Sequence, residues 1–190
     1  MKLKYNAPTV LTFTFFSAAV LVLTLTVHPT LRDEWFRVPG RGSFSFTSAQ
    51  SWVTLFTHVM GHANWNHLIS NFAYILLIGP ILEEYYGSFS LFVMIAITAL
   101  ITGALNVLLF QTGLLGASGV VFMMIILLAS LTNNEKGEIP ITFILILVLY
   151  LGREIFNSFT SSNISEFAHI VGGFCGSLFG FLRPAKTSQN

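Results

Sequence analysis

Charged side chains are scarce in this sequence. Asp, Glu, Lys and Arg make up 9% of the 190 residues, against about 25% in an ordinary soluble domain. Hydrophobic residues make up 54%, and the mean hydropathy is +0.74. This composition excludes a water-soluble domain and predicts an all-α polytopic membrane protein. The net charge of +1 also excludes nucleic acid as an expected partner, since nothing suggests a polyanionic ligand.

Cysteine and aspartate each occur once. A single cysteine, Cys175, excludes an intrachain disulfide and a cysteine-based metal cluster. The only aspartate, Asp33, lies in a polar stretch, whereas an aspartyl intramembrane protease needs two aspartates inside the membrane. His58 and His62 enclose no glutamate, so the His-Glu-x-x-His pattern of zinc proteases is missing. We therefore expect no metal site.

Six apolar runs have the length and boundaries of membrane-crossing helices, for which about 20 apolar residues are needed. We expect the whole chain, 1–190, to form one integral-membrane domain. The expected spans are residues 7–27, 64–82, 88–110, 119–131, 139–156 and 167–182. The polar stretch 28–51 makes the first loop the longest. A slight excess of Lys and Arg on one side predicts that both termini are cytoplasmic and that this loop lies outside.

The fourth run is too short to cross a bilayer alone. Thirteen residues rising 1.5 Å each cover roughly 20 Å, whereas the hydrocarbon core measures about 30 Å. Ser118, within the turn Gly116-Ala117-Ser118-Gly119, would then lie at membrane depth, and residues 111–117 would dip into the bundle. A helix start of this kind can hold an oxyanion. The alternative is that these small residues only allow tight helix packing.

Polar residues also open the second span and the last one. His67 and Asn71 lie four residues apart, so a helix places them on one face, where they would stabilise an anion together. Bonding to neighbouring helices is the alternative. In the last span His169 precedes a stripe formed by Gly172, Gly176 and Gly180, which predicts close helix packing. Ser118 and His169 would start neighbouring spans at similar depth, and a histidine is the usual base for a serine nucleophile.

Three motifs in this order resemble those of the rhomboid intramembrane serine proteases. The similarity extends over about residues 52–182. The motifs are His62-x4-His67-x3-Asn71, Gly116-Ala-Ser118-Gly119 and Ala168-His169-x2-Gly172-x3-Gly176. The resemblance implies a bundle of six transmembrane helices with a long first outer loop.

The resemblance also implies residue roles. Ser118 would be the nucleophile and His169 its base, while His67 and Asn71 would line the oxyanion hole. His62 would be a structural and water-organising residue. Gly116 and Gly119 flank the serine and would support it, and Phe122 stands where the family commonly has a tyrosine stacked on the catalytic histidine.

The function implied is cleavage of transmembrane proteins within a lipid membrane, without a cofactor. The resemblance places the protein in the bacterial cytoplasmic membrane. Two alternatives stay open at the level of sequence. One is a catalytically silent rhomboid-like protein that binds transmembrane helices. The other is a small transporter with His58, His62 and His67 as a proton relay.

Overall fold

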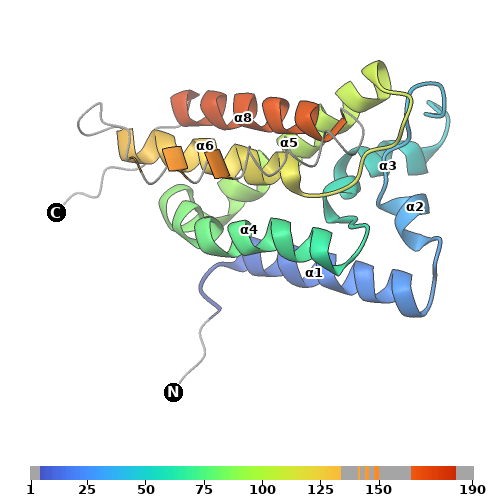
Figure 1. Ribbon diagram of the computed structural model, residues 1–190, viewed down its shortest axis with the longest axis horizontal. Coiled ribbons are helices and arrows are strands. Elements are labelled where there is room, and N and C mark those ends of the chain that lie inside the picture. The colour runs from blue at the N-terminus through green and yellow to red at the C-terminus, as the bar shows by residue number, and fades with distance from the viewer. Residues whose placement is uncertain (1–4, 134–140, 142–143, 146–147, 150–163, 183–190) are drawn as a thin grey trace.

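The protein is a bundle of helices. A computed structural model describes residues 5–133, 141, 144–145, 148–149 and 164–182 (Figure 1). The helices are α1 (Pro8–Thr26), α2 (Leu31–Trp35), α3 (Ala49–Thr57), α4 (Trp65–Tyr86), α5 (Ser88–Leu109), α6 (Ser118–Asn133) and α8 (Ile164–Leu182), with a 3-10 turn η1 (His58–Met60). The fifth expected span, 139–156, lies mostly outside the described residues. The prediction of an all-α fold is confirmed, because a single β-bridge is the only strand-like pairing in the part of the chain described.

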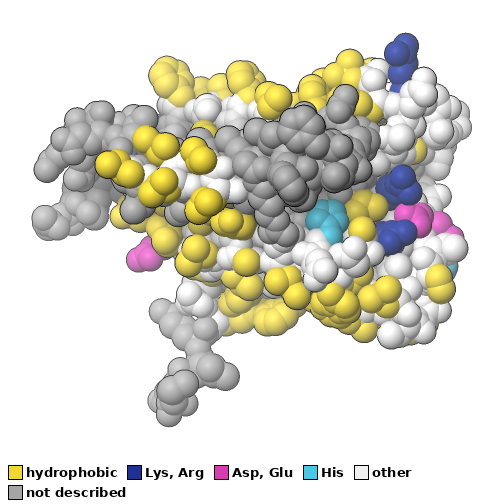
Figure 2. Space-filling model, viewed as in Figure 1, with side chains coloured by type: hydrophobic (Ala, Val, Ile, Leu, Met, Phe, Trp, Pro, Cys, Tyr) yellow, Lys and Arg dark blue, Asp and Glu magenta, His cyan; other side chains and the backbone are white. Residues whose placement is uncertain are grey.

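The surface of the bundle is that of a membrane protein. Helices α1, α4 and α5 are each long and apolar enough to cross a bilayer, and α6 and α8 contain shorter apolar helices. Large apolar side chains such as Leu77, Phe89 and Phe181 are 66%, 78% and 85% exposed, which a water-soluble domain would avoid. Figure 2 shows hydrophobic side chains over the helices and several charged ones gathered at one end. The expectation of a polytopic membrane protein is confirmed.

The start of α1 is fixed by a carboxylate from α4. The buried side chain of Glu83 accepts hydrogen bonds from the backbone N–H groups of Thr9, at 2.8 Å, and Val10, at 3.0 Å. The first N–H groups of a helix have no acceptor within it, and they favour a negative charge. The Thr9 hydroxyl also donates to the Ser88 carbonyl oxygen at 2.9 Å. The first turn of α1 is therefore tied to the junction of α4 and α5.

The first loop contains helices that the sequence analysis missed. Residues 28–51 were expected to be an irregular polar loop, but α2 and the start of α3 lie there. Helix α3 buries Thr54 and Leu55 and packs against α5. Helices of five and nine residues are too short to be stable alone, so their formation depends on tertiary packing that a sequence pattern does not reveal.

Helices α6 and α8 lie side by side along their length (Figure 1). Gly172 and Gly176 of α8 pack on the α6 backbone: a Cβ at either position would overlap the carbonyl oxygen of Gly119 or Met123. A Cβ at Gly180 would meet the Ser130 side chain. Close approach of the two helices brings the first turn of α6, which carries the predicted serine, beside the second turn of α8, which carries the predicted histidine.

Candidate active site

The segment that leads into Ser118 is anchored on the first loop. Val38 and Leu114 exchange two backbone hydrogen bonds of 3.0 Å each. The N–H of Gly116 donates to the carbonyl oxygen of His58 at 2.9 Å. These bonds give the buried backbone polar groups partners, as burial requires. The position of Ser118 therefore depends on the first loop as well as on α6.

The expected dip of residues 111–117 into the bundle is right only for its second half. Leu114, Gly116 and Ala117 are buried, whereas Gln111 and Thr112 are exposed. The amide of Asn106 on α5 donates to the carbonyl oxygen of Thr112 at 3.1 Å. This bond gives the backbone of the exposed half a partner without burying it.

Gly116 makes room for the His67 ring. Its φ of +118° is a conformation that side chains with a Cβ rarely adopt. A Cβ there would lie 2.7 Å from both Cε1 and Nε2 of His67. Ser118, two residues later, is the first residue of α6 and is half-buried. The Nε2 edge of His67 therefore lies beside the turn that carries the serine.

The hydrogen bonds of His67 define its protonation. Its Nδ1 accepts a hydrogen bond from the backbone N–H of Ala63 at 3.3 Å. A neutral imidazole that accepts at one nitrogen carries its proton on the other. The backbone N–H of His67 donates to Oδ1 of Asn64, the N-cap of α4, at 2.9 Å. The ring thus presents an Nε2–H donor toward Gly116.

Asn71 is buried one turn further along α4. Its Nδ2 donates to the carbonyl oxygen of His67 at 2.9 Å. An amide nitrogen has two hydrogens, and this bond uses one of them. Asn71 and His67 share one face of α4, as their spacing in the sequence predicts. A direct contact of Asn71 with an oxyanion stays a prediction.

His169 is held against α6 by an aromatic contact. Its ring stacks on Phe122, with centroids 4.4 Å apart and planes 13° apart. Phe122 is four residues after Ser118 and so shares its helix face. A Cβ at Gly119 would lie 3.2 Å from the carbonyl oxygen of Ala168. The structure therefore brings the immediate neighbours of Ser118 and His169 into contact, while the pairing of their reactive atoms stays a prediction.

His62 lies behind His67 in the buried part of the site. The two ring centroids are 5.0 Å apart. Nδ1 of His62 donates to the Met60 carbonyl oxygen at 3.2 Å. Burial, with a smaller contribution from the neighbouring His67, lowers the pKa of His62 to about 3. The ring is therefore neutral at physiological pH, which is compatible with a structural role.

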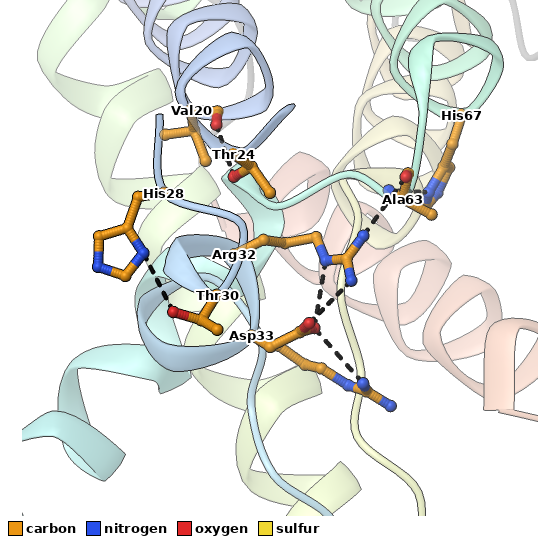
Figure 3. Close-up of polar contacts among 9 residues, drawn as sticks. Val20, Thr24, His28, Thr30, Arg32, Asp33, Ala63 and His67 are labelled. Atoms are coloured by element: carbon orange, nitrogen blue, oxygen red, sulfur yellow. Dashed lines mark hydrogen bonds and ion pairs between the residues drawn. The ribbon is translucent and has the colours of Figure 1, made fainter. Parts of the chain in front are cut away.

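The contacts of Arg32 with Asp33 and with Ala63, beside His67, were not predicted from the sequence. Figure 3 shows the Arg32 guanidinium between Asp33 and Ala63, with Ala63 beside His67. Arg32 donates from Nε and Nη2 to the Asp33 carboxylate, at 3.1 and 2.8 Å. Its Nη1 donates to the carbonyl oxygen of Ala63 at 3.4 Å. The hydrogen bond from Arg32 lowers the pKa of the Asp33 carboxyl below its ordinary value. No sequence signal links Arg32 to Ala63, because they are 31 residues apart.

Residues 49–186 match the model of the rhomboid domain. The chain belongs to the rhomboid family. It is 22% identical to the rhomboid protease GlpG of Haemophilus influenzae over 136 residues, which cover 70% of each chain. It is 30% identical to the putative rhomboid protease YdcA of Bacillus subtilis over 150 residues, which cover 73% of this chain and 70% of that one.

A plant relative is also similar. The chain is 26% identical over 166 residues to rhomboid-like protein 11 of Arabidopsis thaliana, a chloroplastic protein. The match covers 85% of this chain but only 54% of the plant protein, so this rhomboid chain spans about half the length of that relative. Proteins named as proteases are thus among its relatives, together with one named only as rhomboid-like.

Proposed function

We propose that this rhomboid protein is an intramembrane serine protease that cleaves peptide bonds in or near transmembrane helices. Ser118 is the nucleophile, His169 is its general base, and His67 donates a hydrogen bond to the oxyanion. The single observation that carries the proposal is the stacking of His169 on Phe122. It supports a dyad because Phe122 lies one turn after Ser118 on the same helix face.

The chemistry proceeds in two halves. Oγ of Ser118 attacks the carbonyl carbon of the scissile bond while Nε2 or Nδ1 of His169 takes its proton. The C–N bond of the tetrahedral intermediate breaks, the amine leaves with that proton, and an acyl-enzyme remains. A water molecule then attacks the ester, His169 again takes a proton, and Ser118 is released as the alcohol.

The oxyanion site combines two kinds of donor. The first turn of α6 directs backbone N–H groups toward its start, where they have no acceptor within the helix. His67 adds the Nε2–H group that its bond from Ala63 leaves facing Gly116. Removing one donor of an oxyanion hole typically lowers the rate by about 10²- to 10³-fold. We also assign Asn71, one turn beyond His67 on α4, to the lining of the oxyanion site.

Substrates are proposed to be membrane proteins with a single span, cut near the end of the helix that lies on the side of the first loop. The extended backbone needed for attack has to unwind from a helix at that end. We place both termini in the cytoplasm and the protein in a bacterial cytoplasmic membrane, as the distribution of Lys and Arg and the two bacterial relatives favour.

The test is cleavage of a reporter membrane protein by the purified chain in liposomes, with mass spectrometry of the fragments. We expect Ser118→Ala and His169→Ala each to abolish cleavage. Ser177→Ala on α8 and His28→Ala in the first loop are matched controls. Ser177 is exposed and donates a hydrogen bond to the Gly173 carbonyl oxygen of its own helix, and His28 is exposed and contacts Thr30. Both controls should cut at the rate of the unchanged protein.

A fluorophosphonate probe separates this proposal from the two alternatives. Labelling that disappears in Ser118→Ala supports an activated serine. A helix-binding protein or a proton transporter would show no such labelling. Normal cleavage by both Ser118→Ala and His169→Ala would refute the dyad.

A further inference from the structure

Ala63 is bonded on two sides, and both bonds are long. Its N–H donates to Nδ1 of His67 at 3.3 Å, and its carbonyl oxygen accepts from Nη1 of Arg32 at 3.4 Å (Figure 3). Hydrogen bonds weaken steeply beyond such lengths. A displacement of Ala63 by a few tenths of an ångström would therefore break its bond to His67. A contact that holds Ala63 in position therefore also determines which nitrogen of the His67 ring carries the proton.

Arg32 is itself held in place by Asp33. Two of its nitrogens, Nε and Nη2, face the two carboxylate oxygens at 3.1 and 2.8 Å. This forked arrangement orients a guanidinium and leaves Nη1 for the Ala63 carbonyl. Asp33 also has Arg37 at 3.5 Å. The Arg32 and Asp33 side chains are 26% and 41% exposed. An ion pair of that exposure contributes little to global stability. Its main effect is therefore local, because it orients the Arg32 guanidinium toward Ala63.

The consequence of losing this contact falls on His67. A ring released from the Ala63 N–H can place its proton on Nδ1, which leaves a lone pair on Nε2. That lone pair would face the turn Gly116–Ser118 and repel a developing negative charge. The same ring in its other tautomer stabilises that charge.

We propose that Arg32, held by Asp33, is a positioning residue that keeps the proton of His67 on Nε2. The guanidinium bonds the carbonyl oxygen of Ala63, and the N–H of Ala63 bonds Nδ1 of His67. The inference deepens the proposed function and rests on it, because only an oxyanion formed at Ser118 needs that proton. Arg32 itself does not touch the substrate.

The kinetic test compares variants of the full chain in liposomes. Arg32→Ala should lower kcat about 5- to 10-fold and leave KM within about twofold, since the donor acts on the transition state. This decrease in kcat is smaller than that caused by removing an oxyanion donor, because His67 still adopts the Nε2-protonated tautomer part of the time. Arg32→Lys lacks the planar fork that bonds both Asp33 oxygens and directs a third donor at Ala63, so it should show a similar loss. It also keeps the charge, which guards against a folding defect in Arg32→Ala.

A matched control is available in the same loop. Arg41 is exposed, and its backbone N–H donates to the Phe110 carbonyl oxygen, a hydrogen bond that a change of side chain retains. Arg41→Ala removes an equal charge and should leave kcat and KM unchanged. A fall in kcat with Arg41→Ala equal to that of Arg32→Ala would show a general charge effect and overturn the proposal.

The second readout needs no substrate. ¹⁵N NMR of histidine-labelled protein reports which ring nitrogen of His67 is protonated, and His67→Gln identifies its signals. We expect protonated Nε2 in the unchanged protein and in Arg41→Ala, and a mixture of tautomers in Arg32→Ala. An unchanged tautomer in Arg32→Ala overturns the proposal, whatever happens to kcat. If Arg32→Ala shifts the tautomer but the unchanged protein does not cleave the reporter, the proposed function is refuted and the positioning of His67 by Arg32 still stands.

Discussion

Replacing Gly172 by alanine tests the packing of α6 against α8. A Cβ at this position would overlap the carbonyl oxygen of Gly119, with the carbonyl carbon and Cα of Gly119 also close. These are backbone atoms, so no flexible side chain can move aside. The two helices would have to separate by at least about 1 Å to approach a normal contact.

Two effects of that separation can be estimated. Overpacking of this kind destabilises a protein by about 1 to 3 kcal/mol, which lowers the melting temperature of a chain of this size by about 2 to 12 °C. The separation also moves His169, three residues earlier, away from Ser118. A displacement of 1 Å at a catalytic group typically costs about 10²-fold in rate.

The neighbouring glycine provides the control. A Cβ at Gly173 would lie 3.7 Å from Cγ1 of Ile126, an ordinary contact. Gly173→Ala should therefore be neutral or stabilise α8 by up to about 1 kcal/mol. The assays are thermal unfolding in detergent and cleavage of the reporter. Equal melting temperatures and rates for Gly172→Ala and the unchanged protein would refute the reasoning about this contact.

Three further predictions follow from the contacts around the site. Glu83→Ala should destabilise the protein by about 2 to 4 kcal/mol, because the buried N–H group of Val10 and the part-buried one of Thr9 lose their acceptor. Its exposed neighbour gives the control, as Glu84→Ala should change the free energy of unfolding by less than about 0.5 kcal/mol. Gly116→Ala should abolish cleavage by displacing His67, whereas Gly42→Ala, with a positive φ but no atom within 4 Å, should cost stability alone. Loss of stability without loss of cleavage in Gly116→Ala would contradict this. The lowered pKa of Asp33 means that its contribution is present above the ordinary value of 3.8 and lost as the pH falls through the lowered pKa. The difference in melting temperature between Asp33→Asn and the unchanged protein should therefore stay constant from neutral pH to about pH 5 and shrink below about pH 4.

The sequence was sufficient for the membrane class and the family. Long apolar runs predict the helices that became α1, α4 and α5, because length and hydropathy are local properties. The positions of Ser118 and His169 near the starts of two expected spans that run in the same direction predicted that they lie at similar depth, and the structure has their neighbours Gly119 and Ala168 close together. Catalysis by these residues stays a prediction.

The contacts of the first loop and of α1 with the rest of the bundle could not be predicted. The bond from Arg32 to Ala63 and the support of Gly116 by the His58 carbonyl depend on how the first loop folds. That loop has mixed polar and aromatic residues without a clear period, so its short helices were missed. The bond of Glu83 to Val10 joins residues 73 apart in sequence, and only the packing of α1 on α4 reveals it.

The hydrogen bonds between Glu83 and the first turn of α1 limit how far this protein can be shortened from its N-terminus. The family match begins at residue 49, well after α1 ends. A truncation at that boundary would strip the buried carboxylate of both its donors and remove Val10, Phe13 and Leu21 from the hydrophobic core. Such a fragment would keep every proposed catalytic group and still lack part of what holds them in place. We therefore expect the segment matched by the family model to be shorter than the segment that folds stably on its own.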